Sequence, residues 1–277
     1  MPTIVVVGAG VSGLTCALQL AKQKGNVVTV VAKHMPGDYD IEYTSPWAGA
    51  NVLPMALEKD SRWEKQTWPE LSRLAKEVPE AGIHYQTVRV LRRTADASTD
   101  FKGPFSDGLF ALNPWFKTLM PDYHDLPAAS LPPGIHSASE FTSVCINTAV
   151  YLPWLAGQCA AHGVVLRRAV LSHIAEAASL SHSGSRQADI IINASGLLAC
   201  KLGGVMDSKV HARRGQTVLV RNEAGPVMMC MSGTKDGAEE MCYTMTRALG
   251  GGGRYWAGRI SWIIGMRRWM WLWRRGL

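Results

Sequence analysis

Three glycines near the start of the chain have the spacing of a dinucleotide-binding turn. Gly8, Gly10 and Gly13 follow an apolar, β-branched run over residues 3–7 and precede apolar residues at helical spacing. In a strand–turn–helix unit the first glycine permits the tight turn and the second lets a pyrophosphate approach the backbone. The third lets the helix pack closely on the strand. Because the helix N-terminus also presents N–H groups to phosphates, we predict a dinucleotide site here.

The residues after the second predicted strand leave the identity of the dinucleotide open. Residues 27–31 form that strand, and a carboxylate at its end would normally bind a ribose hydroxyl. Lys33 and His34 stand there instead, and the first acidic residue is Asp38. A basic residue at this point also suits a 2′-phosphate, so NADP remains an alternative on local rules alone.

The elements that must position this turn are those of an α/β protein. Helical periodicity predicts one helix over residues 61–78 and another from the N-cap Asn147 to about His162, with Gly163 as its stop. Further strands are expected over residues 85–91, 164–170, 188–196, 215–220 and 240–247. The strand over residues 188–196 would return the chain to the carboxyl edge of the first sheet, beside the glycine turn.

Composition excludes several other classes of protein. The chain has 277 residues, 47% of them hydrophobic, and no run long enough for a membrane span. It has neither a secretory signal nor cysteine spacing suited to a metal, so its six cysteines are interpreted as reduced thiols of an intracellular protein. The net charge of +7 comes almost entirely from six arginines after Gly253, so it does not indicate a nucleic-acid surface.

With these segments in hand, the chain resembles the D-amino-acid oxidase family, specifically its fungal flavoenzymes. The matching motifs keep the family's order and spacing from residue 3 to about residue 252. They are residues 7–14, 43–51, 145–148, 188–196, 213–216 and 243–247.

The resemblance implies non-covalent FAD, since family members carry varied polar or basic residues where Lys33 and His34 stand. It assigns the pyrophosphate to Gly8, Ala9, Gly10, Val11, Ser12 and Gly13, and the adenosine to Lys33 and His34. It places Thr44, Ser45, Gly49, Ala50 and Asn51 along the ribityl chain and isoalloxazine. It places Val170 and Ser195 against the adenosine side and the diphosphate.

The implied reaction converts a D-amino acid, oxygen and water into a 2-oxo acid, ammonia and hydrogen peroxide. Because the substrate hydride passes to the flavin, the chemistry belongs to the cofactor, and we assign no catalytic side chain and no metal. Tyr243 matches the family tyrosine that contacts the substrate carboxylate, and Asn51 is the second substrate-binding candidate. D-aspartate oxidase and a non-catalytic flavin-binding remnant are the alternatives.

The resemblance also sets the expected architecture. We predict a doubly wound, Rossmann-like FAD-binding domain from residues 1–80 and 140–210. A second, antiparallel-sheet substrate domain is expected from residues 81–139 and 211–253, incomplete at its C-terminal end.

Residues 254–277 do not fit this pattern. They hold five of the ten tryptophans and six arginines, with neither strand alternation nor a helical stripe. A shifted reading frame accounts for this composition. One set of codons that encodes this tail, read one base earlier, gives a segment similar to what the family has at this point. We therefore interpret the chain as C-terminally truncated with an out-of-frame or misspliced tail. A cationic aromatic tail that contacts membrane or RNA is the rival interpretation.

The truncated interpretation affects activity and location. The family's carboxylate-binding arginine then has no counterpart, which predicts weakened FAD binding and little turnover. The family is commonly peroxisomal, but the chain ends Arg275-Gly276-Leu277 and not in a Ser-Lys-Leu-type signal, so a cytoplasmic location is the alternative. The expected partners are a D-amino acid and oxygen, with no nucleic acid and no membrane, and a homodimer stays open.

Overall fold

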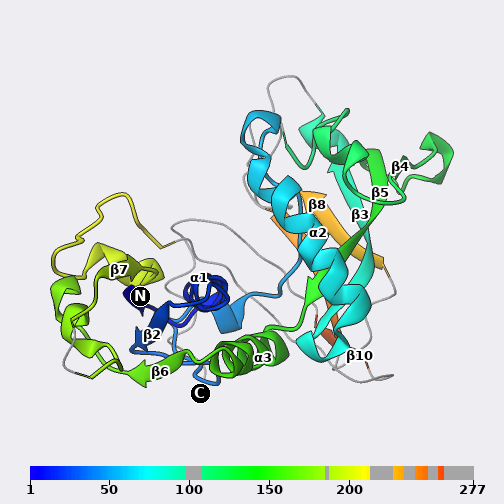
Figure 1. Cartoon of the computed structure of the whole chain (residues 1–277). Helices are drawn as coiled ribbons and strands as arrows, with labels where there is room; N and C mark the ends of the chain where they lie inside the picture. The colour runs from blue at the N-terminus through cyan, green and yellow to red at the C-terminus, as the bar shows by residue number, and fades with distance from the viewer. Residues whose placement is uncertain (98–107, 185–186, 213–226, 234–240, 249–254, 259–277) are drawn as a thin grey trace, which may run out of the picture. The chain divides into compact units, whose positions relative to one another are not determined.

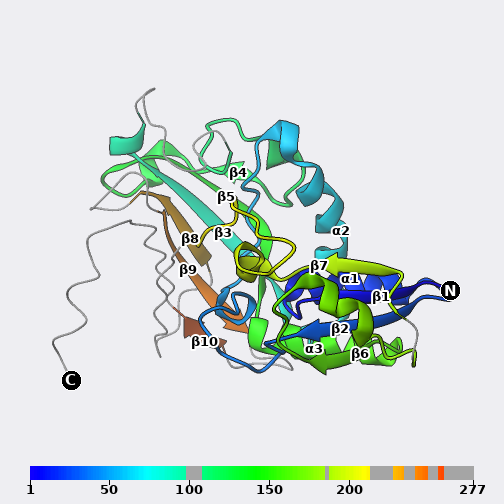
Figure 2. The same ribbon diagram turned by 90° about the vertical axis from the view of Figure 1, so that its left-hand side faces the viewer.

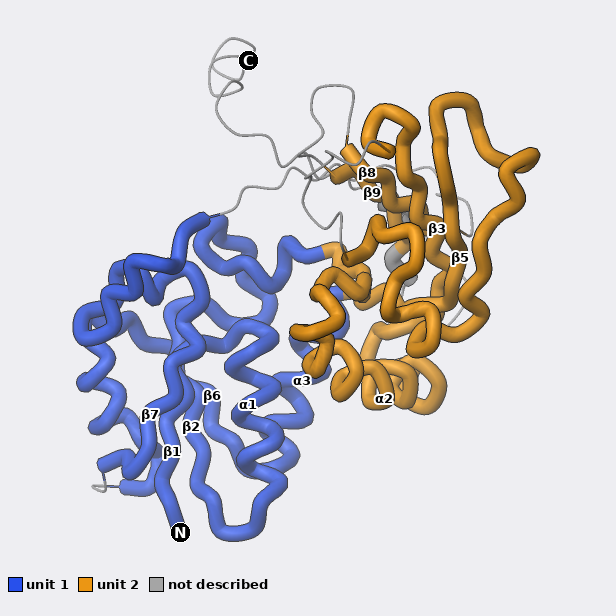
Figure 3. Tube along the Cα trace, turned by 90° about the horizontal axis from the view of Figure 1, so that it is seen from above, with its two compact units in different colours: residues 1–48, 148–212 blue, residues 49–147, 213–277 orange. Residues whose placement is uncertain are grey.

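The computed structural model describes residues 1–97, 108–184, 187–212, 227–233, 241–248 and 255–258. It divides into two compact units, coloured separately in Figure 3. The first unit comprises Met1–Ala48 and Thr148–Ala212, and the second comprises Gly49–Asn147 and Arg213–Leu277. The sequence-based boundary at residue 80 differs from this division. Residues 49–80 group with the second unit because α2 (Arg62–Glu77) packs against the second sheet.

The first unit is built on a four-stranded parallel sheet. Its strands are β1 (Thr3–Val7), β2 (Val27–Ala32), β6 (Val165–Arg168) and β7 (Ile190–Asn193), in the order β6-β2-β1-β7. β1 is buried along its whole length, which explains its continuous apolar sequence. The chain order within this sheet is third-second-first-fourth, the arrangement of nucleotide-binding α/β folds.

Both faces of this sheet are covered. On one face α1 (Val11–Ala21) and α3 (Thr148–Ala161) lie side by side (Figure 1), and the Cys159 thiol donates to the Leu14 carbonyl between them. On the other face the short 3-10 helix η7 (Ile174–Leu180) packs over Val5 and Val31 through its buried Ala177. The predicted doubly wound domain is confirmed, with a 3-10 segment in place of an α-helix on the second face.

The second unit contains a six-stranded sheet in the order β10-β9-β8-β3-β5-β4. Its strands are β3 (Ile83–Arg93), β4 (His124–Asp125), β5 (Ile135–Ile146), β8 (Val227–Ser232), β9 (Met241–Ala248) and β10 (Tyr255–Gly258). β3 and β5 run antiparallel along most of their length (Figure 2). The predicted antiparallel sheet has one exception, because β8 runs parallel to β3. The chain between β5 and β8 passes through the first unit, and such a long crossover permits a parallel pair.

The helices and turns match most of the predicted positions. α2 confirms the helix expected over residues 61–78, with Trp68 and Leu74 buried, and α3 ends before Gly163, whose φ of +79° suits a helix stop. The remaining 3-10 turns are η1 (Ser45–Trp47), η2 (Glu58–Asp60), η3 (Pro79–Ala81), η4 (Thr94–Asp96), η5 (Trp115–Thr118), η6 (Ala128–Ser130) and η8 (Gly196–Cys200). Among the described residues no helix combines the length and apolarity that a membrane span requires.

Two sequence-based expectations fall largely on residues that the structure does not describe. The strand expected over residues 215–220 lies outside the described residues, as does the segment 259–277. Of the arginine- and tryptophan-rich segment, Tyr255–Gly258 forms β10 and pairs antiparallel with β9. The sequence pattern did not predict this strand.

Candidate nucleotide-binding site

A cavity of about 530 Å³ opens at the carboxyl ends of all four strands of the first sheet. Its walls are residues 7–12 after β1, 31–34 after β2, 169–171 after β6 and 194–198 after β7, together with residues 42–45, Lys201 and Leu202. This volume is typical of a small-molecule or cofactor site. The carboxyl edge is also where open α/β sheets bind their ligands.

The glycine turn is shaped by close backbone contacts. Gly8 has a φ of +118°, and a Cβ there would lie 2.1 Å from the Ala194 carbonyl oxygen. A Cβ on Gly13 would lie 1.9 Å from the Gly8 carbonyl oxygen. Packing of α1 against the turn therefore requires glycine at position 13, and the close approach of Ala194 requires it at position 8. Gly10 differs, because a Cβ there would meet side chains and no backbone: the Ser45 hydroxyl oxygen at 2.9 Å and Tyr43 Cε2 at an ordinary contact distance of 3.8 Å. Gly10 therefore keeps open a backbone cradle of the kind that a pyrophosphate fills.

The N-terminus of α1 carries the charge distribution that an anion needs. Gly10 is its N-cap and has no side chain of its own to cap the helix, and the first turn has no acidic residue. The Ser45 hydroxyl oxygen accepts a hydrogen bond from the Val11 N–H at 3.0 Å. Since an accepting hydroxyl still has its own proton to donate, this end of the cavity offers donors suited to phosphate oxygens.

Tyr43 connects the glycine turn to the loop after β2. Its hydroxyl donates to the Ala9 carbonyl at 2.7 Å, and its ring stacks on His34 with 5.8 Å between ring centroids. Burial raises the pKa of Tyr43 to about 12, so the phenol keeps the proton that this hydrogen bond uses. The cavity wall on this side is therefore held by a fixed aromatic pair.

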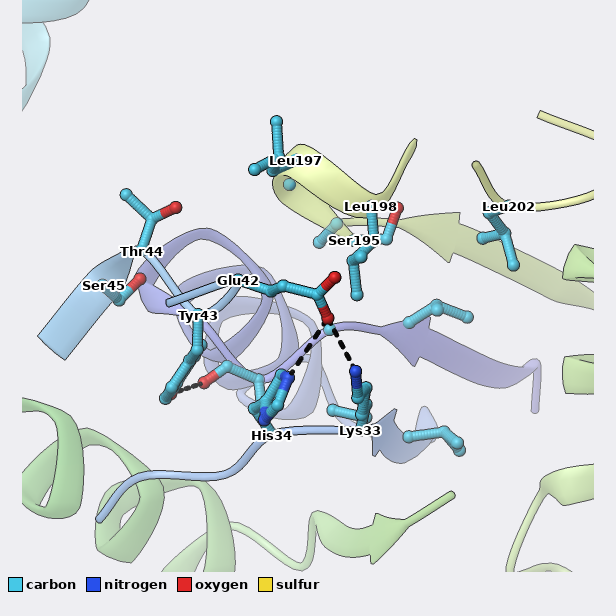
Figure 4. Close-up of a pocket in the computed structure, with 18 of the residues that line it drawn as sticks. Lys33, His34, Glu42, Tyr43, Thr44, Ser45, Ser195, Leu197, Leu198 and Leu202 are labelled. Carbon is cyan, nitrogen blue, oxygen red and sulfur yellow. Dashed lines mark hydrogen bonds and ion pairs between the residues drawn. The ribbon is translucent and has the colours of Figure 1, made fainter. Parts of the chain in front are cut away.

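A carboxylate that the sequence analysis did not select lies in the cavity wall. Glu42 Oε2 is 2.6 Å from Lys33 Nζ and 4.0 Å from His34 Nε2 (Figure 4), and Glu42 Oε1 is 4.0 Å from Lys201 Nζ. The hydrogen bond from Lys33 lowers the pKa of Glu42, so this group is ionised at neutral pH. The dinucleotide-binding pattern expects a carboxylate at the end of β2, whereas Glu42 comes from the loop that returns to that point.

The same loop contains a group with metal-binding donor types. Atoms of His34, Asp40 and Glu42 lie within 4.8 Å of one another. The ammonium of Lys33 contacts the Glu42 carboxylate. Its positive charge opposes binding of a cation at this position.

The structure brings most of the predicted cofactor residues together. Those that line the cavity are Gly8, Ala9, Gly10, Val11, Ser12, Lys33, His34, Thr44, Ser45, Val170 and Ser195. Gly13 lies beneath the turn, where it contacts Gly8. Gly49, Ala50, Asn51 and Tyr243 belong to the second unit. Cavity residues that the sequence analysis did not select include Glu42, Tyr43, Ala169, Leu171, Leu197, Leu198, Lys201 and Leu202.

Asn51 and Tyr243, the two substrate-binding candidates in the second unit, both have buried polar groups. Asn51 forms a β-bridge with Cys145, and both polar atoms of its side-chain amide are buried without a hydrogen-bond partner among the described residues. A buried amide of this kind fits a ligand that offers both a donor and an acceptor, as the flavin pyrimidine edge does. Tyr243 lies on β9 opposite Cys230, and burial raises the pKa of its phenol, which therefore remains a donor.

The parallel sheet, the glycine turn and the cavity at the strand ends define a dinucleotide-binding α/β protein. A family model described as FAD dependent oxidoreductase matches residues 3–268. The chain belongs to this family, so FAD is its cofactor and it is an oxidoreductase. This settles the choice between FAD and NADP that the residues after β2 had left open.

Comparison with individual proteins supports this assignment. The chain is 55% identical to a D-amino-acid oxidase from Fusarium vanettenii over 250 residues, which cover 90% of this chain and 69% of that protein. It is 36% identical over 225 residues to a D-amino-acid oxidase from Schizosaccharomyces pombe, covering 79% of this chain and 59% of that protein. Fungal D-aspartate oxidases also match, at lower identity.

A solved structure shows the same fold. The L-proline dehydrogenase from P. horikoshii superposes with a TM-score of 0.61 at 18% identity, covering 95% of this chain and 71% of that one. At this identity the similarity concerns the fold alone. It supports the arrangement of a nucleotide-binding unit and a second sheet unit along one chain.

Proposed function

We propose that this chain catalyses the FAD-dependent oxidative deamination of D-amino acids. The reaction takes a D-amino acid, oxygen and water to a 2-oxo acid, ammonia and hydrogen peroxide. The observation that carries the proposal is the 55% identity to the Fusarium D-amino-acid oxidase over 90% of the chain. The family match over residues 3–268 includes the cavity residues 7–202. The same cavity has the glycine cradle and the helix N-terminus that the FAD diphosphate requires.

The chain's own residues bind and orient, and the oxidising power comes from the cofactor. Bound FAD would supply the hydride acceptor for the substrate Cα. Gly10 and the N-terminal end of α1 would hold the diphosphate, and Ser45 would supply a hydroxyl beside them. This arrangement requires no protein nucleophile and no metal.

Tyr243 is the proposed partner of the substrate carboxylate. Because burial raises the pKa of its phenol, Tyr243 stays neutral at physiological pH and donates a hydrogen bond to a carboxylate. Asn51, whose buried amide has no hydrogen-bond partner among the described residues, is the proposed second contact, to the flavin or the substrate. These two residues would orient the amino acid, which sets the stereochemistry of hydride loss.

The experiment is a half-reaction followed by flavin absorbance. The purified full-length chain is loaded with FAD, and D-alanine is added without oxygen. We expect bleaching of the flavin bands with D-alanine and none with L-alanine. A flavin that stays oxidised with D-alanine and D-aspartate alike would show a non-catalytic flavin-binding protein and contradict the proposal.

D-aspartate oxidation is the second candidate function, because D-aspartate oxidases are among the more distant relatives. The same experiment separates the two candidates. Bleaching by D-aspartate at concentrations at which D-alanine is inert would favour this second function. The peroxisomal location implied by the family resemblance is also a proposal, and microscopy of an N-terminally tagged chain in a fungal cell tests it.

A further inference from the structure

The loop between β2 and η1 brings a carboxylate to the end of β2, where the strand itself is directly followed by no acidic residue. In dinucleotide-binding folds an acidic side chain after the second strand accepts hydrogen bonds from the adenosine ribose. Here Lys33 and His34 follow β2, and a lysine ammonium has no acceptor. Glu42, from the far end of the loop, lies 2.6 Å from the Lys33 ammonium and lines the same cavity.

The position of Glu42 is fixed by contacts at both ends of its loop. The Asp38 carboxylate accepts two hydrogen bonds from Arg168 of β6, at 2.5 and 3.1 Å, and a third from the Met35 N–H at 2.9 Å. On the other side Tyr43 donates to Ala9. Because these contacts tie the loop to β6 and to the glycine turn, Glu42 is held where Figure 4 shows it, beside Lys33 and His34.

The negative charge of Glu42 disfavours a phosphorylated ribose and opposes the attraction that the neighbouring ammonium groups exert on a phosphate. The carboxylate is paired with Lys33 and lies 4.0 Å from the Lys201 ammonium. Lys33 uses one of the several acceptor positions of the carboxylate, so others remain for hydroxyl donors. A 2′-phosphate placed there would meet the negative charge of Glu42. Without Glu42, the two ammonium groups would attract it.

We propose that Glu42 is the ribose-binding and specificity-determining carboxylate of this chain. It accepts hydrogen bonds from the adenosine ribose hydroxyls and excludes a 2′-phosphate, although it comes from the loop and not from the end of β2. This inference rests on the FAD cofactor of the proposed function and is independent of the amino acid that is oxidised.

The test compares two nucleotides that differ only in the 2′-phosphate. Isothermal titration of the flavin-free, full-length chain measures binding of ADP-ribose and of 2′-phospho-ADP-ribose. We expect the wild-type chain to favour ADP-ribose by about tenfold or more. Glu42→Gln should weaken ADP-ribose binding about 10- to 100-fold, the range for a hydrogen bond to a charged group, and should abolish or reverse the preference.

Two further variants give the test its controls. Glu70→Gln removes an exposed carboxylate that is also paired with a cation, Arg73, but lies in the second unit, so both affinities should be unchanged. Lys33→Met leaves the Glu42 charge in place and should keep the preference for ADP-ribose. Circular dichroism of each variant confirms that it is folded.

Three results would overturn the proposal. The first is a Glu42→Gln variant that prefers ADP-ribose as strongly as wild type does. The second is a Lys33→Met variant that loses the preference for ADP-ribose as fully as Glu42→Gln does, which would make Lys33 the ligand and Glu42 its support. The third is a wild-type chain that binds neither nucleotide. Because peroxide is not measured, a chain that selects ADP-ribose but leaves D-amino acids unoxidised would contradict the proposed function and leave this inference intact.

Discussion

The Ser45 hydroxyl accepts a hydrogen bond from the backbone N–H of Val11 at 3.0 Å, which joins η1 to the first residue of α1. The family resemblance implies a place for Ser45 along the ribityl chain. In the structure its oxygen lies at the N-terminus of α1, where we propose that the diphosphate binds. One hydroxyl thus satisfies a helix N–H and still offers its own proton to a ligand.

Ser45→Ala should weaken FAD binding without unfolding the chain. The variant removes one neutral hydrogen bond, so we expect affinity to fall about twofold to tenfold, by quenching of flavin fluorescence. Ser130→Ala is the matched control, because its hydroxyl donates only within an exposed turn of the second unit. Equal affinities for wild type and Ser45→Ala would show that this hydroxyl does not contact the cofactor.

A series of glycine variants separates packing from ligand binding. Gly13→Ala places a Cβ 1.9 Å from a backbone oxygen, so it should lower the free energy of unfolding by about 3 kcal/mol or more. In Gly10→Ala the added Cβ meets only side-chain atoms, of Ser45 and Tyr43, so the variant should keep stability largely intact and reduce FAD binding. Urea unfolding and flavin titration measure the two effects.

Gly157→Ala is the control for this series. Gly157 lies within α3, and a Cβ there meets nothing within 4 Å, so we expect a gain of about 0.5–1 kcal/mol in unfolding free energy. A loss of stability in Gly157→Ala, or equal stability losses in Gly10→Ala and Gly13→Ala, would contradict this account of the turn.

Asp96 is a buried, hydrogen-bonded side chain whose removal should destabilise the second unit. Its carboxylate is 1% exposed, and it accepts hydrogen bonds from Arg93 at 2.6 and 2.8 Å and from the Ser232 hydroxyl at 2.8 Å. Asp96→Ala leaves a half-buried guanidinium without this partner, so we expect a loss of about 3–5 kcal/mol in unfolding free energy. Glu70→Ala, which breaks an exposed pair with Arg73, should cost less than about 1 kcal/mol. Similar losses in the two variants would contradict this prediction.

Tyr243→Phe tests the proposed substrate contact. Removing the phenol proton donor should raise the D-alanine concentration for half-maximal flavin bleaching about tenfold, the magnitude of a hydrogen bond to a charged group. Tyr85→Phe is the control, since the Tyr85 hydroxyl bonds only to Ser72 on α2 in the described residues. An unchanged half-maximal concentration in Tyr243→Phe would remove this residue from the substrate site.

The sequence predicted the nucleotide-binding unit well because its signals are local. The β-branched run of β1, the glycine spacing and the apolar period of α1 lie within about twenty residues, and each has one physical interpretation. The parallel pairing of β3 and β8 has no such local signal, because it depends on a crossover through the first unit. The grouping of residues 49–80 with the second sheet depends on α2 packing in the same way.

Glu42 shows the same limit within the site. Its position in the sequence, after Pro36 and Gly37, indicates only a polar loop. What brings it back to the end of β2 is the contact of Asp38 with Arg168, two residues 130 positions apart. Contacts between residues so far apart in the chain depend on the tertiary structure. The residues after β2 therefore indicated no carboxylate at this point, whereas the fold brings Glu42 there.

The Asp38–Arg168 pair makes a prediction about acid stability. The hydrogen bond from Arg168 lowers the pKa of Asp38 from its ordinary value of 3.8 to about 2. A depressed carboxyl pKa stabilises the fold at pH values above the unfolded value, and this contribution is lost as the pH falls through the folded value. The difference in unfolding free energy between wild type and Asp38→Asn should therefore be constant above about pH 5 and shrink between about pH 4 and pH 2. Denaturant unfolding across this range measures the difference, and Arg168→Gln should reproduce the effect because it removes the same pair. A difference that stays constant down to pH 2.5 would show that the Asp38–Arg168 contact does not hold the loop in solution.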